Sequence, residues 1–176
     1  MKFLIKIKDK NFQRRGMTFL ELMVAIFVLT VGIAGTLALI HQTIAASSAA
    51  ANRFKAAYLA QEGIEVVRNI RDENWINDRD WLAGLENRLC GEVVFNSTTI
   101  ENCPGEVPQL LRFRDGFYSY DLAGVASIFS RKITLTSEVV TAMGETTRLR
   151  VEVTVFWSER GVEQRIVIVE NLYNWR

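Results

Sequence analysis

The sequence has few of the residues that build most catalytic and metal centres. It contains one histidine, His41, and two cysteines, Cys90 and Cys103, and it has no glycine-rich phosphate loop. Two cysteines cannot fill a zinc coordination shell, and no His or Cys pair has metal-ligand spacing. We therefore predict no catalytic residue, no metal site and no bound cofactor, and we expect a protein that is not an enzyme.

Proline is also scarce, and none occurs between Met17 and Ile70. A proline inside a helix removes a hydrogen bond and breaks or kinks it, so nothing of that kind interrupts this stretch. The run Ala45–Ala51 is almost all alanine and serine, and alanine has the highest helix propensity. These features predict one helix of roughly fifty residues, about 80 Å long, from Met17 to near Ile70.

Charge is nearly absent from the first half of that helix. From Met17 to Ile40 there are 24 residues, and Glu21 is the only charged one. Such a length crosses a bilayer core of about 30 Å, so we predict that residues 17–40 span a membrane. A carboxylate within a span costs several kcal/mol unless it is paired, which indicates a function and a partner for Glu21. The alternative is a carboxylate that snorkels to the interface from the start of the helix.

Basic side chains are concentrated before the span. Residues 1–16 hold six of the 21 Lys and Arg residues and one acid, which leaves 15 basic and 19 acidic side chains in the remainder, a net charge of −4. Basic residues before a span stay cytoplasmic, so the chain after Ile40 is expected outside the cytoplasm. The acidic body argues against a nucleic-acid partner.

Residues 1–16 are interpreted as a leader that ends before the apolar region. The rival interpretation is cleavage after the span, near Ala45-Ala46-Ser47.

The chain after the span predicts an α+β domain. Residues 41–70 carry an apolar stripe with helical spacing, formed by Ala56, Leu59, Gly63, Val66 and Ile70. Residues 72–80 are rich in Asp and Asn and are expected to form a loop. Residues 71–176 are expected to form a globular domain whose antiparallel sheet is covered by the stripe. The strand candidates are Glu92–Asn96, Phe117–Asp121, Ile128–Thr136, Arg148–Ser158 and Val162–Leu172.

Two features of that domain leave alternatives open. Both faces of Val162–Leu172 are apolar, which suggests a central strand or one covered by another subunit. Cys90 and Cys103 flank a segment that can form a loop, and in an exported domain they are expected to form a disulfide worth about 3 kcal/mol. Two ordinary buried thiols are the alternative.

The N-terminal residues resemble a known family. The segment Gly16-Met17-Thr18-Phe19-Leu20-Glu21 and the apolar residues after it are similar to the cleavage and methylation motif of type IV pilins and type II secretion pseudopilins. The resemblance implies that prepilin peptidase cuts after Gly16, that Met17 becomes the N-methylated first residue, and that Glu21 contacts a neighbour's terminal amine. It also implies a long helix packed on an antiparallel sheet, and assembly on an inner-membrane platform protein.

The expected function is therefore a structural subunit of a type IV pilus or a type II secretion pseudopilus. The absence of proline from the membrane half resembles minor pilins of the V subgroup and the I-type minor pseudopilin. The expected partners are the peptidase and methyltransferase, other pilin subunits, the platform protein and the lipid bilayer. The expected location is the inner membrane, with the C-terminal domain outside the cytoplasm, and then the filament at the cell surface. The alternative is a singly anchored surface binding module, an adhesin or DNA-uptake tip, that is not processed.

Overall fold

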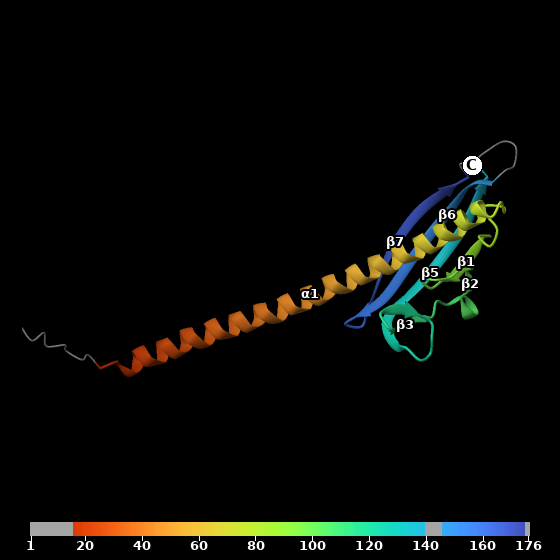
Figure 1. Ribbon diagram of the computed structural model, residues 1–176. Helices are drawn as coiled ribbons and strands as arrows, with labels where there is room; N and C mark the ends of the chain where they lie inside the picture. The colour runs from red at the N-terminus through yellow and green to blue at the C-terminus, as the bar shows by residue number, and fades with distance from the viewer. Residues whose placement is uncertain (1–15, 140–145, 175–176) are drawn as a thin grey trace, which may run out of the picture. The chain divides into compact units, whose positions relative to one another are not determined.

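The computed structural model describes residues 16–139 and 146–174; the predicted leader, apart from Gly16, lies outside this range. The described residues form one long helix, one short 3-10 helix and seven strands (Figure 1). The chain divides into two compact units, Met1–Ala46 and Ser47–Arg176. The predicted fold class, a long N-terminal helix packed on a C-terminal antiparallel sheet, is confirmed.

The helix α1 spans Phe19–Ile76 without interruption. The predicted single helix is confirmed, but the prediction that residues 72–80 form a loop is wrong for its first half. Buried contacts hold the last turn despite its polar composition. The Arg71 guanidinium lies 4.6 Å from the centroid of the Trp75 ring, and Asn74 Nδ2 donates a hydrogen bond of 2.8 Å to the Ala83 carbonyl. Tertiary contacts therefore extend the helix beyond its apolar stripe.

The strands form one antiparallel sheet that centres on β5. The strands and the short helix are β1 (Arg88–Glu92), β2 (Glu101–Asn102), the 3-10 helix (Pro104–Glu106), β3 (Leu110–Arg114), β4 (Phe117–Ser119), β5 (Val125–Val139), β6 (Thr146–Glu159) and β7 (Val162–Tyr173). Strands β1 and β3 both pair with β5, as does β6, and β7 pairs with β6. The short strands β2 and β4 extend the sheet beyond β1 and β3.

The core lies between α1 and one face of β5 and β6. All five residues of the predicted stripe are buried, and they face the alternating buried residues of the two strands. The helix lies close to the sheet at Gly63, where an added Cβ would lie 3.1 Å from Val153 Cγ1 and 3.3 Å from Arg131 Cδ. Any larger residue at this position would require these side chains to shift by a few tenths of an ångström, so glycine favours the close approach.

Three strand predictions need correction. The first strand is Arg88–Glu92 and not Glu92–Asn96, because the chain turns after Val93, where Ser97 N donates to the Val94 carbonyl. Strand β3 was not predicted, because its sequence Leu-Leu-Arg-Phe-Arg does not alternate cleanly. Strand β7 is not central, because β6 is its one partner among the described residues.

A disulfide joins Cys90 of β1 to Cys103, whose Cα atoms lie 5.4 Å apart. Both cysteines are buried. Close by, the buried Glu92 carboxylate accepts hydrogen bonds from Gln109 N at 2.7 Å and from Gln109 Nε2 at 3.0 Å. The covalent bond and these two hydrogen bonds together hold the 3-10 helix and its flanking chain against β1.

Arg131 is a charged residue in the middle of the apolar core, and it is completely buried. Its Nη1 donates to the Leu59 carbonyl at 2.8 Å and to Glu62 Oε1 at 2.9 Å, and its Nη2 donates to the Val93 carbonyl. One guanidinium thus joins α1, β5 and the segment after β1. Burial, partly offset by the nearby Arg131 charge, raises the pKa of Tyr120 to about 12 in the same region.

We expect Arg131→Met to lower the free energy of unfolding by about 3 kcal/mol, because two buried carbonyls lose their donor and Glu62 loses its partner. Chemical denaturation in detergent micelles measures the change. Arg150→Met is the matched control, since Arg150 is exposed and its pair with Glu152 is worth less than about 0.5 kcal/mol. Equal effects of the two substitutions would contradict a central role for Arg131.

Candidate processing and assembly site

The predicted cleavage point lies in an accessible part of the chain. Residues 16–18 have no regular secondary structure, and Gly16 and Met17 are both exposed. A Cβ added at Gly16 would meet no atom within 4 Å. An exposed segment that precedes a helix can enter the active site of a peptidase without unfolding the helix first. The Gly16–Met17 bond thus lies in an exposed, non-helical part of the described chain.

Thr18 caps the start of α1. Its Oγ1 accepts a hydrogen bond of 3.3 Å from Glu21 N, and its carbonyl accepts one of 3.2 Å from Leu22 N. Thr at the cap with Glu three residues later is the spacing of a capping box. Our sequence reasoning assigned a role to Glu21 but none to Thr18, although this spacing could have revealed it.

Glu21 lies in the first turn of α1, and its side chain is exposed. The first turn carries the positive end of the helix dipole, which stabilises a carboxylate there. Met17 is four residues earlier, in the non-helical segment that precedes α1. Gly16, Met17 and Glu21, which were singled out from the sequence, thus lie within six consecutive residues around the start of α1. Cys90 and Cys103 belong to the globular unit and not to this site.

The threonine hydroxyls farther along α1 form hydrogen bonds within the helix itself. The hydroxyls of Thr30, Thr36 and Thr43 donate to the carbonyls of Phe27, Gly32 and Leu39 at 2.8–2.9 Å. Hydrogen bonds of this kind let a hydroxyl enter a membrane at little cost. The most apolar 18-residue window of α1 has a mean hydropathy of 2.5, and none of it is buried in the protein. This part of α1 is long and apolar enough to cross a membrane.

Comparison with protein families assigns the same residues to a known motif. The prokaryotic N-terminal methylation motif matches residues 11–37, which include Gly16, Met17 and Glu21. This match supports the resemblance of the N-terminus to those of type IV pilins and pseudopilins. The pilin-like assignment agrees with the long apolar helix and the antiparallel sheet of this chain. Comparison with curated proteins and with solved structures found no match.

Other possible sites are less well supported in this pilin-like chain. Among residues 16–139 and 146–174, no three His, Cys, Asp or Glu side chains are grouped so that they could hold a metal ion. His41 is exposed on α1, one residue beyond the predicted span. The N-terminal motif is thus the best-supported functional feature of the chain.

We expect Thr18→Val to speed hydrogen exchange at the Glu21 amide by about fivefold, because loss of a cap costs about 1 kcal/mol. Thr18→Ser, which keeps the hydroxyl, is the control and should leave the exchange rate close to that of the original chain. Amide exchange followed by NMR in detergent micelles measures both. Similar rates in the Val and Ser variants would show that the cap does not hold the first turn.

Proposed function

We propose that this chain is a structural subunit of a type IV pilus or a type II secretion pseudopilus. In this proposal residues 1–16 are a leader, prepilin peptidase cuts after Gly16, and Met17 is methylated on its new amine. Residues 17–40 anchor the subunit in the inner membrane, and residues 71–176 lie outside the cytoplasm. The observation that carries the proposal is the exposed, non-helical Gly16–Met17 bond a few residues before a carboxylate, Glu21, in the first turn of a long apolar helix.

Cleavage would create a positively charged partner for the Glu21 carboxylate. Before cleavage, residue 17 has an amide nitrogen, which carries no charge. After cleavage, Met17 has an ammonium group. Between neighbouring subunits that are displaced along the helix axis, Glu21 of one would meet the Met17 amine of the next. In a low-dielectric bundle, breaking such a pair leaves an unpaired buried charge, so it would fix the axial register as well as association.

The minor-subunit assignment rests on the helix. Its membrane half contains no proline, and Gly32 and Gly35 occupy its middle, with no atom within 4 Å of an added Cβ at either position. These features support a minor pilin of the V subgroup or an I-type minor pseudopilin. The partners in this proposal are the peptidase and methyltransferase, other subunits and the inner-membrane platform protein.

Gly16→Leu should leave the full-length precursor in the membrane, because a bulky side chain would occupy the peptidase site next to the scissile bond. Gly35→Leu is the matched control: it makes the same change in the open part of α1 and should still be processed. Intact-mass spectrometry and N-terminal sequencing of the membrane fraction measure both. A Gly16→Leu protein that begins at residue 17 would refute cleavage at this site, and an original chain that retains residues 1–16 would favour an unprocessed surface binding module.

Glu21→Val should spare membrane insertion and cleavage but reduce incorporation into filaments by about tenfold or more, because the neighbour's amine would lose its counter-charge. Glu21→Asp keeps the charge and should retain more assembly than the valine variant. Quantitative immunoblotting of sheared filaments against the membrane fraction measures incorporation. Equal incorporation of all three proteins would rule out the register role of Glu21.

A further inference from the structure

The long strand β7 leaves one edge of the sheet open. At the opposite edges, β2 has two residues and β4 has three, whereas β7 has twelve and pairs with β6 in regular register along its whole length. The strand contains no proline. Every second residue of an edge strand directs its backbone N–H and C=O groups away from the sheet, where another strand can bind. Proteins usually cover or distort such an edge, and β7 is neither distorted nor, among the described residues, covered.

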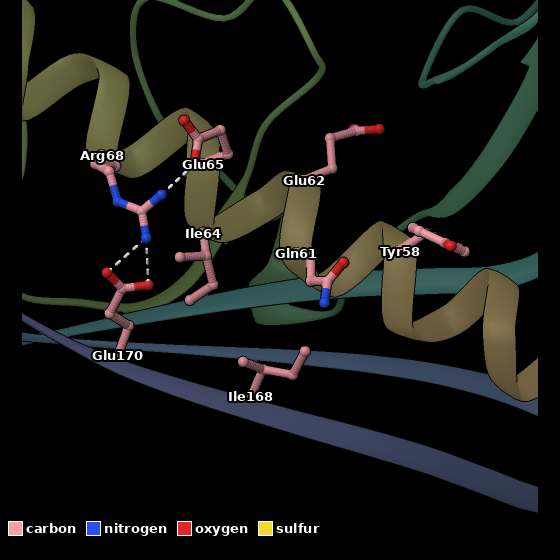
Figure 2. A pocket seen from close by; sticks show the side chains of 8 residues that line it. All are labelled: Tyr58, Gln61, Glu62, Ile64, Glu65, Arg68, Ile168 and Glu170. Atoms are coloured by element: carbon pink, nitrogen blue, oxygen red, sulfur yellow. Dashed lines mark hydrogen bonds and ion pairs between the residues drawn. The ribbon is translucent and has the colours of Figure 1, made fainter.

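A groove of about 600 Å³ runs between this edge strand and α1 (Figure 2). Ile64 of the helix points toward Ile168 of β7 and gives the groove an apolar floor. Gln61 and Tyr58 lie along the same stretch of the helix, and the Tyr58 side chain is exposed. A strand added to β7 would place every second side chain in this groove.

The rim of the groove is acidic. Glu62, Glu65 and Glu170 line it together with a single cation, Arg68. Arg68 Nη2 binds both oxygens of Glu170 at 2.7 and 2.8 Å, and its Nη1 binds Glu65 (Figure 2). Even with the buried Arg131 counted as the partner of Glu62, carboxylates outnumber guanidinium groups by one. The hydrogen bond to Glu170 raises the pKa of Arg68, so Arg68 stays charged.

A second copy of β7 fits this groove poorly. The residues of β7 that face the helix side are Gln164, Ile166, Ile168, Glu170 and Leu172. None of them is basic, so a second β7 would bring another Glu170 and no cation. Like charges on neighbouring strands destabilise their pairing. An inward-pointing charge on an edge strand discourages self-association while leaving the edge available to a partner of opposite charge.

We propose that β7 and this groove bind an extended segment of a different protein chain, which adds a strand to the sheet. On its groove side the segment carries apolar side chains beside Ile166 and Ile168, and a Lys or Arg beside Glu170. Backbone hydrogen bonds supply affinity in this binding mode, and the side chains in the groove supply specificity. The groove belongs to the globular unit, so this proposal does not depend on cleavage at Gly16.

The test uses the full chain in detergent micelles and a fluorescent peptide of about eight residues, the usual length of a strand. One face of the peptide carries threonine, and the other carries lysine followed by two valines, the order that places lysine beside Glu170 in an antiparallel strand. Fluorescence anisotropy should show saturable binding, with affinity about tenfold or more above that of the peptide in which glutamate replaces lysine. Two further peptides are N-methylated at every second residue, one at the odd and one at the even positions. Only one of the two should lose binding, because only one of the two alternating sets of N–H groups faces β7.

Glu170→Lys and Glu65→Lys should each weaken binding of the lysine peptide by about tenfold and favour the glutamate peptide instead, because each reverses a charge on the rim. The Glu65→Lys variant keeps the test valid if Glu170→Lys misfolds, since Glu65 is exposed and its loss leaves the Arg68–Glu170 pair in place. Glu163→Lys is the matched control: it makes the same charge change on the same strand, outside this groove, and should change affinity by less than about twofold.

Four results would overturn the proposal. They are no binding of the lysine peptide, equal effects of the two N-methylation frames, equal loss of affinity in the Glu163→Lys control, and binding of a peptide with the β7 sequence as tight as that of the lysine peptide. The last result would make the occupant of the edge a second copy of this chain.

Discussion

The fold of the globular unit depends on a single guanidinium in its core. Arg131 is fully buried, and it reaches the Leu59 carbonyl, Glu62 and the Val93 carbonyl from one side chain. Apolar contacts between helix and sheet are tolerant of small shifts, whereas these directional hydrogen bonds are satisfied in one position of the helix only. The Arg131 contacts therefore select the register of α1 on the sheet, and the register in turn brings Arg68 to Glu170 at the rim of the groove.

The sequence predicted the parts of the fold that have a clear period. The helical stripe and the long strands β5, β6 and β7 were recognised because burial imposes a spacing of 3.6 or 2 residues. Arg131 lies within the predicted strand Ile128–Thr136, but its role could not be predicted, since its partners in α1 lie 69 and 72 residues away in the chain. Strand β4 was also predicted, as part of Phe117–Asp121, whereas the last turn of α1 and the short strands β1, β2 and β3 depend on contacts with other segments, which no local pattern encodes.

The residues of the candidate site lie close together in the sequence, unlike those that build the domain after it. Gly16, Met17 and Glu21 lie within six consecutive residues, so their relation is visible in the sequence itself, and the matched motif covers them. The cap made by Thr18 was overlooked because Glu21 was considered for its charge and not for its backbone N–H. The groove beside β7 could not have been predicted, because it joins residues of the helix to residues about a hundred positions later in the chain.

The internal hydrogen bonds of Thr30, Thr36 and Thr43 have a mechanical consequence. Because each hydroxyl is already bonded to its own helix, the surface from Leu22 to Ile40 offers a neighbouring helix dispersion contacts without direction. Such contacts resist separation but hardly resist sliding or rotation. In a bundle of these helices, the apolar surfaces would let neighbouring helices slide along their axes under tension and return without breaking an interhelical hydrogen bond. Only the proposed charge pair of Glu21 at the helix start would oppose such sliding.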